Sequence, residues 1–436
     1  MEWQWALVLL IGGLLFLFMI GLPVAFCFIM IDIVGLLLVS GQVGALQFVR
    51  SLTSALADFV LVPVPLYILM GEVLLHSELG NDIIDALDKW FGRVPGRLAL
   101  LCVGLGTLFA AMTGISTATI SLMGRIVLPE MEKRGYNSHL SLGTIMGSSS
   151  LAVMIPPSAL AVLLAAVGQI SVGETLMAII IPGFLMAILF AGYILLRCLF
   201  QPSIAPSYVV ESTSLRDRFL PSVKYLLPVV FIIFMVIGVI LFGIATPAES
   251  AATGALGIFI ITAIHKRLSW AVVRKSFAST TRLTIQLFLI VGGAAAFSQI
   301  LTFTGCTEGL INFSRSMALS PVWIIVAMMV VGLIMGMFML VAPILMITIP
   351  VFMPIVLALG FNPYWFAVLM MINMEVGVIS PPVGVNLFTM KIVAPPHITM
   401  ADVYRSSFPF IACDLIVIAL VMIFPPLALW LPGLMK

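Results

Sequence analysis

Charged side chains are scarce in this sequence. Only 9% of its 436 residues are Asp, Glu, Lys or Arg, whereas an average soluble domain has about 25%. Hydrophobic residues make up 62%, so water cannot be the main solvent of the folded chain. The net charge of +2 gives no reason to expect a nucleic-acid partner.

Several catalytic and cofactor patterns are also missing. No GxxxxGK[ST] phosphate loop occurs, so we expect an ion gradient rather than ATP to supply the energy. Four scattered histidines do not form a catalytic set, which argues against an intramembrane enzyme. We expect no cofactor, and neither a disulfide framework nor a transition-metal site, because the cysteines lie in or beside apolar runs without CxxC spacing: Cys27, Cys102, Cys198, Cys306 and Cys413.

Apolar runs recur along the whole chain. Many have about 17 residues or more, enough for a helix to cross a hydrocarbon core of about 30 Å. The start of the sequence has no basic region or cleavage site, so the first run is expected to be a retained span. Basic residues concentrate in a few connections, which the positive-inside rule places in the cytoplasm. The sequence predicts an all-α, multi-pass protein of the bacterial inner membrane, with about ten crossing helices and two re-entrant hairpins.

Polar residues interrupt the apolar runs at two kinds of place. Residues 98–130 are expected to enter and leave on the cytoplasmic side as a hairpin, with a buried polar tip at residues 113–117. Residues 140–168 are expected to form a broken helix, interrupted at residues 147–150 and at Pro156-Pro157, since proline removes an amide donor.

An internal repeat appears at an offset of 225 residues. It pairs Pro129 with Pro354, and Pro156-Pro157 with Pro381-Pro382. Each half has five crossings, an odd number, so the second copy must be inverted. We therefore expect two inverted repeats with these parts: residues 1–220, comprising scaffold helices 5–76, an amphipathic arm 77–97, hairpin 98–130, broken helix 140–168 and helix 175–197; and residues 221–436, comprising scaffold helices 225–303, an arm 304–321, hairpin 322–360, broken helix 363–393, interrupted at Gly377 and at Ser380-Pro381-Pro382, and helix 405–432.

Paired broken helices are typical of secondary transporters. Their half-helix N-termini attract anions, and freed carbonyls and hydroxyls can replace the water shell of Na⁺. Hydroxyls near each break are therefore candidate cation ligands, although serine hydroxyls often bond back to helical carbonyls instead. Isolated charges within apolar runs are further candidates: Arg125 and Lys391 for a substrate carboxylate, and Glu375 for a cation or a proton. For four other acids, interhelical pairing is the expected role: Asp32, Glu72, Glu249 and Asp414.

The motifs together resemble the large membrane subunit of tripartite ATP-independent periplasmic (TRAP) transporters. The resemblance covers most of the chain. Each motif alone is weak, but the motifs together are specific. It rests on residues 21–26 (GLPVAF), 246–252 (TPAESAA), 129–131 with 135–136 (PEM and GY), 147–158 (ending IPPS), 377–384 (ending SPPVG) and 424–433.

This resemblance implies an elevator-type, Na⁺-coupled importer of organic acids. It implies two partners, a small four-helix membrane subunit and a periplasmic substrate-binding protein, and places the sites at the hairpin tips and the facing broken helices. The implied sites are as follows: Na⁺ site 1, Thr113, Gly114, Ser116, Thr117, Gly147, Ser148, Ser149 and Pro156; Na⁺ site 2, Met339, Val341, Asn373, Glu375, Gly377, Ser380 and Pro381; substrate, Ser150, Arg125, Pro157, Pro382 and Asn386.

One residue departs from the family pattern, and one alternative stays open. Leu340 stands where the second hairpin tip of the family usually carries an acid, so the coupling ion and stoichiometry are open. The alternative carrier is a dicarboxylate or citrate transporter of similar architecture that works without partner chains.

Overall fold

The structure is a computed structural model that describes residues 2–88, 94, 96–114, 116–206, 219–317 and 319–435. Within these ranges it is helical throughout, with no strand. The expected all-α membrane fold is therefore confirmed. Parts of the predicted segments lie outside the described residues: 89–93 and 95 in the first arm, 115 in the first hairpin, 207–218 near the predicted boundary between repeats, and 318 in the second arm.

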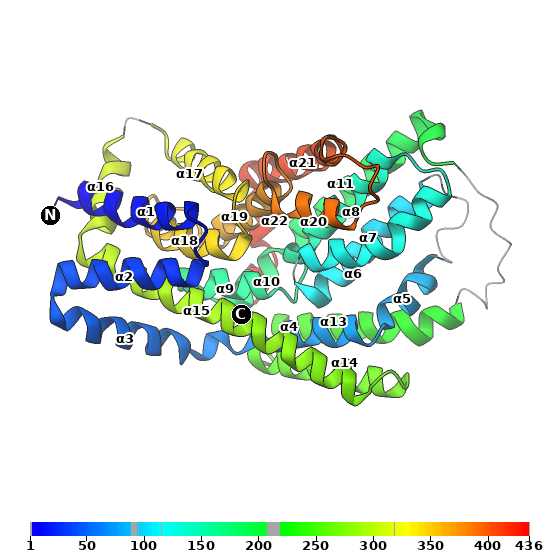
Figure 1. Cartoon of the computed structure of the whole chain (residues 1–436), viewed down its shortest axis with the longest axis horizontal. Helices are drawn as coiled ribbons and strands as arrows, with labels where there is room; N and C mark the ends of the chain where they lie inside the picture. The colour runs from blue at the N-terminus through cyan, green and yellow to red at the C-terminus, as the bar shows by residue number, and fades with distance from the viewer. Residues whose placement is uncertain are drawn as a thin grey trace.

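The helices follow one another in a similar order in the two halves (Figure 1). The first half contains α1 (Trp3–Met19), α2 (Val24–Ser40), α3 (Gln42–Leu56), α4 (Pro63–His76), α5 (Leu79–Asp88), α6 (Arg97–Thr113), α7 (Ser116–Lys133), α8 (Ser138–Met154), α9 (Ala159–Gly168), α10 (Val172–Ala178) and α11 (Ile180–Phe200). The second half contains the π-helical turn η3 (Ser222–Leu226), α13 (Leu227–Leu241), α14 (Pro247–Ile264), α15 (Trp270–Phe303), α16 (Cys306–Ser316), α17 (Pro321–Gly336), α18 (Val341–Ala358), α19 (Pro363–Val378), α20 (Val385–Val393), α21 (Met400–Ile423) and α22 (Pro426–Leu429).

Both double-proline breaks are confirmed. Helix α8 ends at Met154 and α9 begins at Ala159, and the two are bent by 47°. The Ser158 hydroxyl caps α9 by accepting a hydrogen bond from the amide of Ala161, at 3.3 Å. In the second half, α19 ends at Val378 and α20 begins at Val385. Two consecutive residues without an amide hydrogen cannot continue either helix.

Two further predicted interruptions are wrong. Helix α8 runs unbroken through residues 147–150, and α19 runs unbroken through Gly377. In α8 the hydroxyls of Ser149 and Ser150 donate to the carbonyls of Met146 and Gly147, at 2.6 and 2.7 Å, so they stay within the helical hydrogen-bond pattern. A single glycine costs a helix only about 1 kcal/mol, which packing outweighs.

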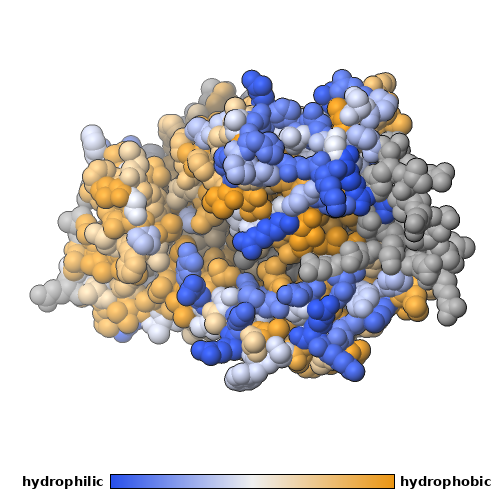
Figure 2. All heavy atoms as spheres, turned by 45° about the vertical axis from the view of Figure 1, so that its right-hand side comes forward, coloured by the Kyte–Doolittle hydropathy of each residue, from blue (hydrophilic) through white to orange (hydrophobic). Residues whose placement is uncertain are grey.

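The length and apolarity of the helices fit a membrane protein. Among the described residues, seven helices are long and apolar enough to cross a bilayer, or eight with the bent pair α8–α9. One of the seven is α18, an arm of the second hairpin, whereas α1, α2 and α19 are apolar helices just below that length. Hydrophilic side chains gather on the end of the molecule that comes forward in Figure 2, beside broad apolar surface.

The two hairpins lie toward opposite ends of the molecule. In Figure 1, α6 and α7 lie to the right, whereas α17 and α18 lie to the left, near the N-terminus. Hairpin 1 is α6–α7, which turns at residues 114–115, and hairpin 2 is α17–α18, which turns at residues 337–340. Hairpins at opposite ends of the molecule agree with the inverted repeat predicted from the proline pattern.

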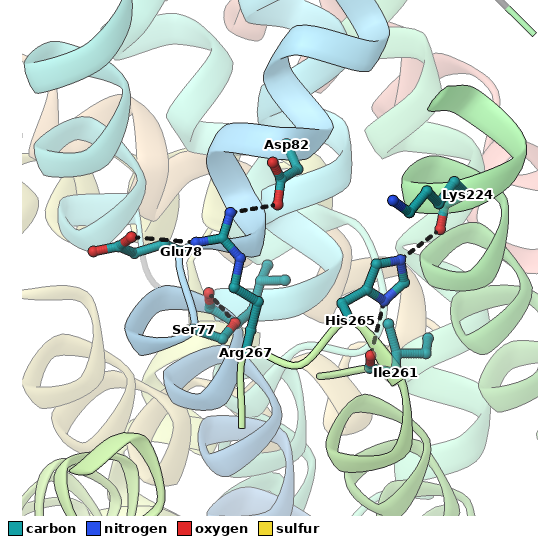
Figure 3. A network of polar contacts seen from close by, with 8 residues as sticks. Ser77, Glu78, Asp82, Lys224, Ile261, His265 and Arg267 are labelled. Atoms are coloured by element: carbon teal, nitrogen blue, oxygen red, sulfur yellow. Dashed lines mark hydrogen bonds and ion pairs between the residues drawn. The ribbon is translucent and has the colours of Figure 1, made fainter. Parts of the chain in front are cut away.

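The first arm helix, α5, and Glu78 just before it are bonded to the connection between α14 and α15 (Figure 3). Arg267, between α14 and α15, pairs with Glu78 at 3.6 Å and with Asp82 at 3.2 Å. Beside it, the His265 ring contacts the carbonyls of Ile261 and Lys224, at 2.8 and 2.9 Å. Because α5 also packs against η3, the arm lies beside the start of α13 and the end of α14.

Candidate ion and substrate site

The tip of hairpin 1 lies against the first helix break. Gly114 has φ +59°, and a Cβ added there would meet the Ala159 nitrogen at 3.4 Å and the Pro157 carbonyl oxygen at 3.9 Å. The backbone of the tip thus touches the start of α9. The side chain of Thr113 lies outside the described residues, while Ser116 is buried and Thr117 is half-buried in the first turn of α7.

The serine run of α8 packs against α6, the first arm of this hairpin. All three serines are fully buried, and Ser148 Oγ has no hydrogen-bond partner in the described part of the chain. Gly106 of α6 approaches the Ser148 carbonyl so closely that an added Cβ would lie 2.4 Å from it. Gly147 instead faces the Phe410 ring of α21. Ser148 is therefore the hydroxyl that is available to a ligand, and Gly147 serves packing.

The tip of hairpin 2 is bonded to the second break. The amide of Gly384 donates to the Met337 carbonyl at 2.7 Å. Gly336 and Gly377 meet backbone to backbone, since a Cβ added to Gly336 would lie 2.8 Å from the Gly377 Cα. This contact explains why glycine stands inside an unbroken helix.

Several residues predicted for the second ion site have protein partners. The Asn373 amide donates to the Met329 carbonyl of α17 at 2.8 Å, and Ser380 Oγ donates to the Val376 carbonyl at 2.6 Å. Around this site, Met339 is half-buried, Val341 begins α18 and Pro381 lies in the break. Leu340 is 47% exposed and provides no side-chain cap for α18. The amide of Asn373 thus joins α19 to α17, whereas the hydroxyl of Ser380 bonds back to the last turn of α19.

Contacts between the two halves were not predicted. The first arm of each hairpin packs on the broken helix of its own half: α6 on α8, and α17 on α19. The second arm also packs on the broken helix of the other half: α7 on α20, and α18 on α9. At one such crossing the Asn386 amide donates to Ser116 Oγ at 3.1 Å, and both residues are buried. The half-helix N-termini of α7 and α20 therefore meet.

Interhelical pairing was predicted for four acids, and it holds for Glu72 of α4, which interacts with Ser279 of α15, but not for Glu249, whose described contacts are local to the start of α14. Asp32 and Asp414 are fully buried without a hydrogen-bond partner in the part of the chain that is described. Glu72 pairs with His76 of its own helix at 3.3 Å, and Glu249 caps α14 through Thr246. Glu375 is likewise fully buried, with neither carboxylate oxygen bonded among the described residues.

The two candidate cations lie away from the hairpin tips. Arg125 is exposed and lines a cavity of about 220 Å³ with Glu78 and Phe109. Lys391 Nζ donates to the Ile398 carbonyl beyond the end of α20. The break itself is reached by Tyr404 of α21, whose hydroxyl donates to the Pro382 carbonyl at 2.5 Å.

A larger polar cavity lies between α3 and α15 on one side and α9 and α18 on the other. It has a volume of about 530 Å³, and its lining includes three glutamines, Gln47, Gln169 and Gln299. Gln47 Nε2 donates to Gln299 Oε1 at 3.0 Å. The sequence analysis missed this surface, which the mixture of polar and apolar residues in α3 could have indicated.

The fold and these breaks define a class. Opposed hairpins, broken helices and buried polar tips are the architecture of a membrane transporter permease, not of an enzyme. The family model of the tripartite ATP-independent periplasmic transporter, DctM component, matches residues 11–427. The chain belongs to this family, which confirms the resemblance and makes it a multi-pass inner-membrane transporter subunit.

Individual relatives agree. The chain is 30% identical over 404 residues to the C4-dicarboxylate TRAP transporter large permease protein DctM of Pseudomonas aeruginosa, covering 90% of this chain and 93% of that protein. It is 26% identical over 429 residues to the ectoine TRAP transporter large permease protein TeaC of Halomonas elongata, covering 98% and 99%. It is 27% identical over 385 residues to the isethionate TRAP transporter permease protein DctMQ of Oleidesulfovibrio alaskensis, covering 87% of this chain and 59% of that protein.

Two solved transporters share the fold. MtrF of Neisseria gonorrhoeae gives a TM-score of 0.63 at 14% identity, covering 91% of this chain and 85% of that chain. YdaH of Alcanivorax borkumensis gives 0.57 at 14% identity, covering 91% and 90%. At these identities the likeness concerns the architecture alone.

Proposed function

We propose that this subunit imports a small organic anion and couples the import to a Na⁺ gradient. The observation that carries the proposal is the meeting of each hairpin tip with a helix break, at Gly114 beside Pro157 and at Met337 bonded to Gly384. Half-helix N-termini there supply partial positive charge for an anion. Break carbonyls and the Ser148 hydroxyl supply oxygens for a hard cation.

The substrate class rests on the relatives. Their names assign C4-dicarboxylates, ectoine and isethionate to three of them. No Lys or Arg side chain is described at the tips of this chain, so helix dipoles, not a side-chain cation, would hold the anionic group. We propose a carboxylate as the first substrate to test.

The subunit would work with partners and by relative movement. We propose a periplasmic binding protein that delivers substrate and a small four-helix membrane subunit, the latter supported by one relative that is named as a DctMQ permease. We further propose an elevator movement in which the hairpins and broken helices slide past α1–α4 and α13–α15. The polar cavity between α15 and α18 lies along that boundary.

Reconstitution tests the function. Proteoliposomes containing this chain with its two partners would be assayed with a panel of labelled carboxylates under Na⁺, Li⁺ or H⁺ gradients. We expect uptake that needs Na⁺ and the binding protein. Uptake that is equally fast with this chain alone would instead support the stand-alone carrier, and uptake without any dependence on Na⁺ would contradict the coupling.

A further inference from the structure

A cavity of about 380 Å³ lies where the start of α13 meets the end of α14, beside the arm helix α5. Its lining contains two kinds of residue. The polar and charged ones are Asp82, Lys224, His265, Lys266 and Arg267, and the apolar ones are Tyr225, Pro228, Ile261 and Ile264. A cavity that combines cations with apolar side chains fits a ligand that has both an anionic group and an apolar part.

Two lysines of the lining have no acidic partner among the described residues. Arg267 is already paired with Asp82 at 3.2 Å and with a second acid of the arm. Lys224 and Lys266 form no ion pair within the described ranges, and Lys224 Nζ lies instead 4.8 Å from the centre of the Tyr225 ring. Asp82 is the one acid among the described lining residues. The cavity therefore keeps an excess of positive charge that an anion can compensate.

The backbone fixes Lys224 beside the cavity. This residue lies in the π-helical turn η3, and its carbonyl contacts His265 Nε2 at 2.9 Å, which joins the start of α13 to the end of α14. Short π-helical turns are frequent at functional sites. In Figure 3 the Lys224 side chain extends toward the side on which Asp82 and Arg267 lie.

Lys266 occupies a backbone position that favours glycine. It follows the end of α14 with φ +56°, and the next amide, that of Arg267, donates to the Thr262 carbonyl at 3.0 Å. Glycine is the commonest residue at this place in a helix C-terminus because it has no Cβ. Replacement of Lys266 by glycine would thus remove the ammonium group and leave the backbone in a conformation that it prefers.

Exposed apolar side chains continue from the cavity along both helices. Ile264 of the lining is 70% exposed, and Ile260, one turn earlier in α14, is 50% exposed. On α13, Phe231 lies one turn beyond Pro228 of the lining and is 65% exposed. A small soluble anion would make no use of these side chains, whereas an acyl chain would cover them.

The position of the cavity along the helices fits a phospholipid. It lies at one end of two segments that are long and apolar enough to cross a membrane, Phe219–Leu241 and Pro247–Ile264. The positive-inside rule assigns the basic connections at this end to the cytoplasm. The membrane surface on that side carries anionic lipids, which are attracted to basic residues. A phosphate group at this level would reach the lysines while its acyl chains follow the two helices.

We propose that this cavity binds one anionic phospholipid, whose phosphate contacts Lys224 and Lys266 and whose acyl chains lie along α13 and α14. Because Asp82 of α5 lines the same cavity, the lipid also contacts the arm helix. The proposal does not rest on the proposed transport function.

Native mass spectrometry of the purified full chain in a non-ionic detergent tests lipid binding without substrate or partner chains. The probe is phosphatidylglycerol, and the comparisons are phosphatidylcholine, which has no net charge, and inorganic phosphate, which has no acyl chain. We expect the chain to retain one phosphatidylglycerol molecule under conditions that remove phosphatidylcholine. The thermal unfolding midpoint should rise with phosphatidylglycerol but not with the same concentration of inorganic phosphate.

Variants locate the site. Lys224→Gln and Lys266→Gly should each weaken phosphatidylglycerol binding about fivefold, the contribution expected of one lysine at a membrane surface. Lys266→Gly should do so although its midpoint without lipid stays equal or rises, because glycine fits the positive φ. The control with matched charge for Lys224→Gln/Lys266→Gly is Arg274→Gln/Lys275→Gln, which removes two exposed cations of α15 outside the cavity lining and should leave retention of the single lipid unchanged.

Four results would overturn the proposal. Equal retention of phosphatidylcholine would show that the anionic charge is not recognised. Equal stabilisation by inorganic phosphate would make the cavity a site for a soluble anion. Equal losses in the control variant would indicate diffuse attraction by the basic surface instead of a site. Unchanged binding in both Lys224→Gln and Lys266→Gly would place the lipid elsewhere.

Discussion

At the residue scale, unused hydrogen-bonding capacity separates ligands from packing groups. Of the three serines at residues 148–150 of α8, two donate back to their own helix, and Ser148 keeps a hydroxyl without a partner among the described residues. The glycines divide similarly, because Gly377 touches Gly336 whereas Gly238 of α13 has nothing within 4 Å of an added Cβ.

Ser148→Ala should weaken Na⁺ binding. Loss of one oxygen ligand is expected to raise the Na⁺ concentration for half-maximal uptake about tenfold, equivalent to about 1.4 kcal/mol. Uptake against Na⁺ concentration in proteoliposomes measures this. Thr262→Ala is the control, since that buried hydroxyl of α14 bonds back to the Ile258 carbonyl at 2.7 Å. Equal Na⁺ dependence in both variants would remove Ser148 from the site.

Gly377→Ala should separate hairpin 2 from α19. The added Cβ would lie 2.7 Å from the Gly336 Cα, and backbone atoms cannot rotate away. Overpacking of this kind costs about 1–3 kcal/mol. The thermal unfolding midpoint in detergent should fall, and it should stay unchanged or rise in Gly238→Ala. A midpoint that is unaffected by Gly377→Ala would show that the two helices do not touch.

At the element scale, the sequence predicted which segments break, and the family resemblance paired each hairpin tip with the break of its own half, but neither predicted the contacts between the halves. Proline predicts both breaks because its missing amide acts locally. The predicted interruptions at Gly377 and at the serine run were wrong because the sequence does not show tertiary contacts. Packing against Gly336 keeps the turn at Gly377 helical, and hydroxyl bonds back to helical carbonyls keep the serine run helical. The contact of Asn386 with Ser116 joins residues 270 positions apart, and no local pattern encodes such a distance. The internal repeat therefore predicted where the hairpins and broken helices lie in the sequence, whereas only the structure shows which of them are in contact.

Arg267→Ala should loosen the arm helix α5. Its ion pairs with Glu78 and Asp82 are partly exposed, so the stability loss should be small, about 0–1 kcal/mol. Hydrogen exchange in α5 should nevertheless accelerate, because these pairs join α5 to the connection that precedes α15. Arg134→Ala, which removes a pair with Glu130 within α7, should leave exchange in α5 unchanged. Faster exchange in both variants would point to general destabilisation.

At the scale of the whole molecule, the polar cavity marks the boundary that an elevator movement would cross. Gln169 at the end of α9 and Gln299 of α15 line it from opposite sides, while Gln47 and Gln299 lie on the same side and are hydrogen-bonded. The described native cysteines are all buried, so introduced cysteines at these positions can be modified selectively.

Cross-linking across the boundary should stop transport. Gln169→Cys/Gln299→Cys treated with a bifunctional thiol reagent is expected to lose uptake and to regain it when a cleavable linker is reduced. Gln47→Cys/Gln299→Cys should cross-link without loss. Full activity after complete cross-linking of the first pair would contradict relative movement between α9 and α15.

The third long segment differs between the halves, since α3 and α4 are interrupted at residues 57–62 while α15 is one helix of 34 residues. At 1.5 Å per residue α15 extends about 51 Å, against a hydrocarbon core of about 30 Å. To remain within the core it would have to incline by on the order of 50°, well beyond the usual 20°. With Arg274, Lys275 and Arg282 in its first half, its N-terminal turns are instead expected to extend through the phosphate layer of the cytoplasmic leaflet. Bilayer thickness and anionic lipid content should therefore determine the tilt and depth of α15 in the membrane. They should also determine the depth of the helices packed against it, α2, α3 and α4.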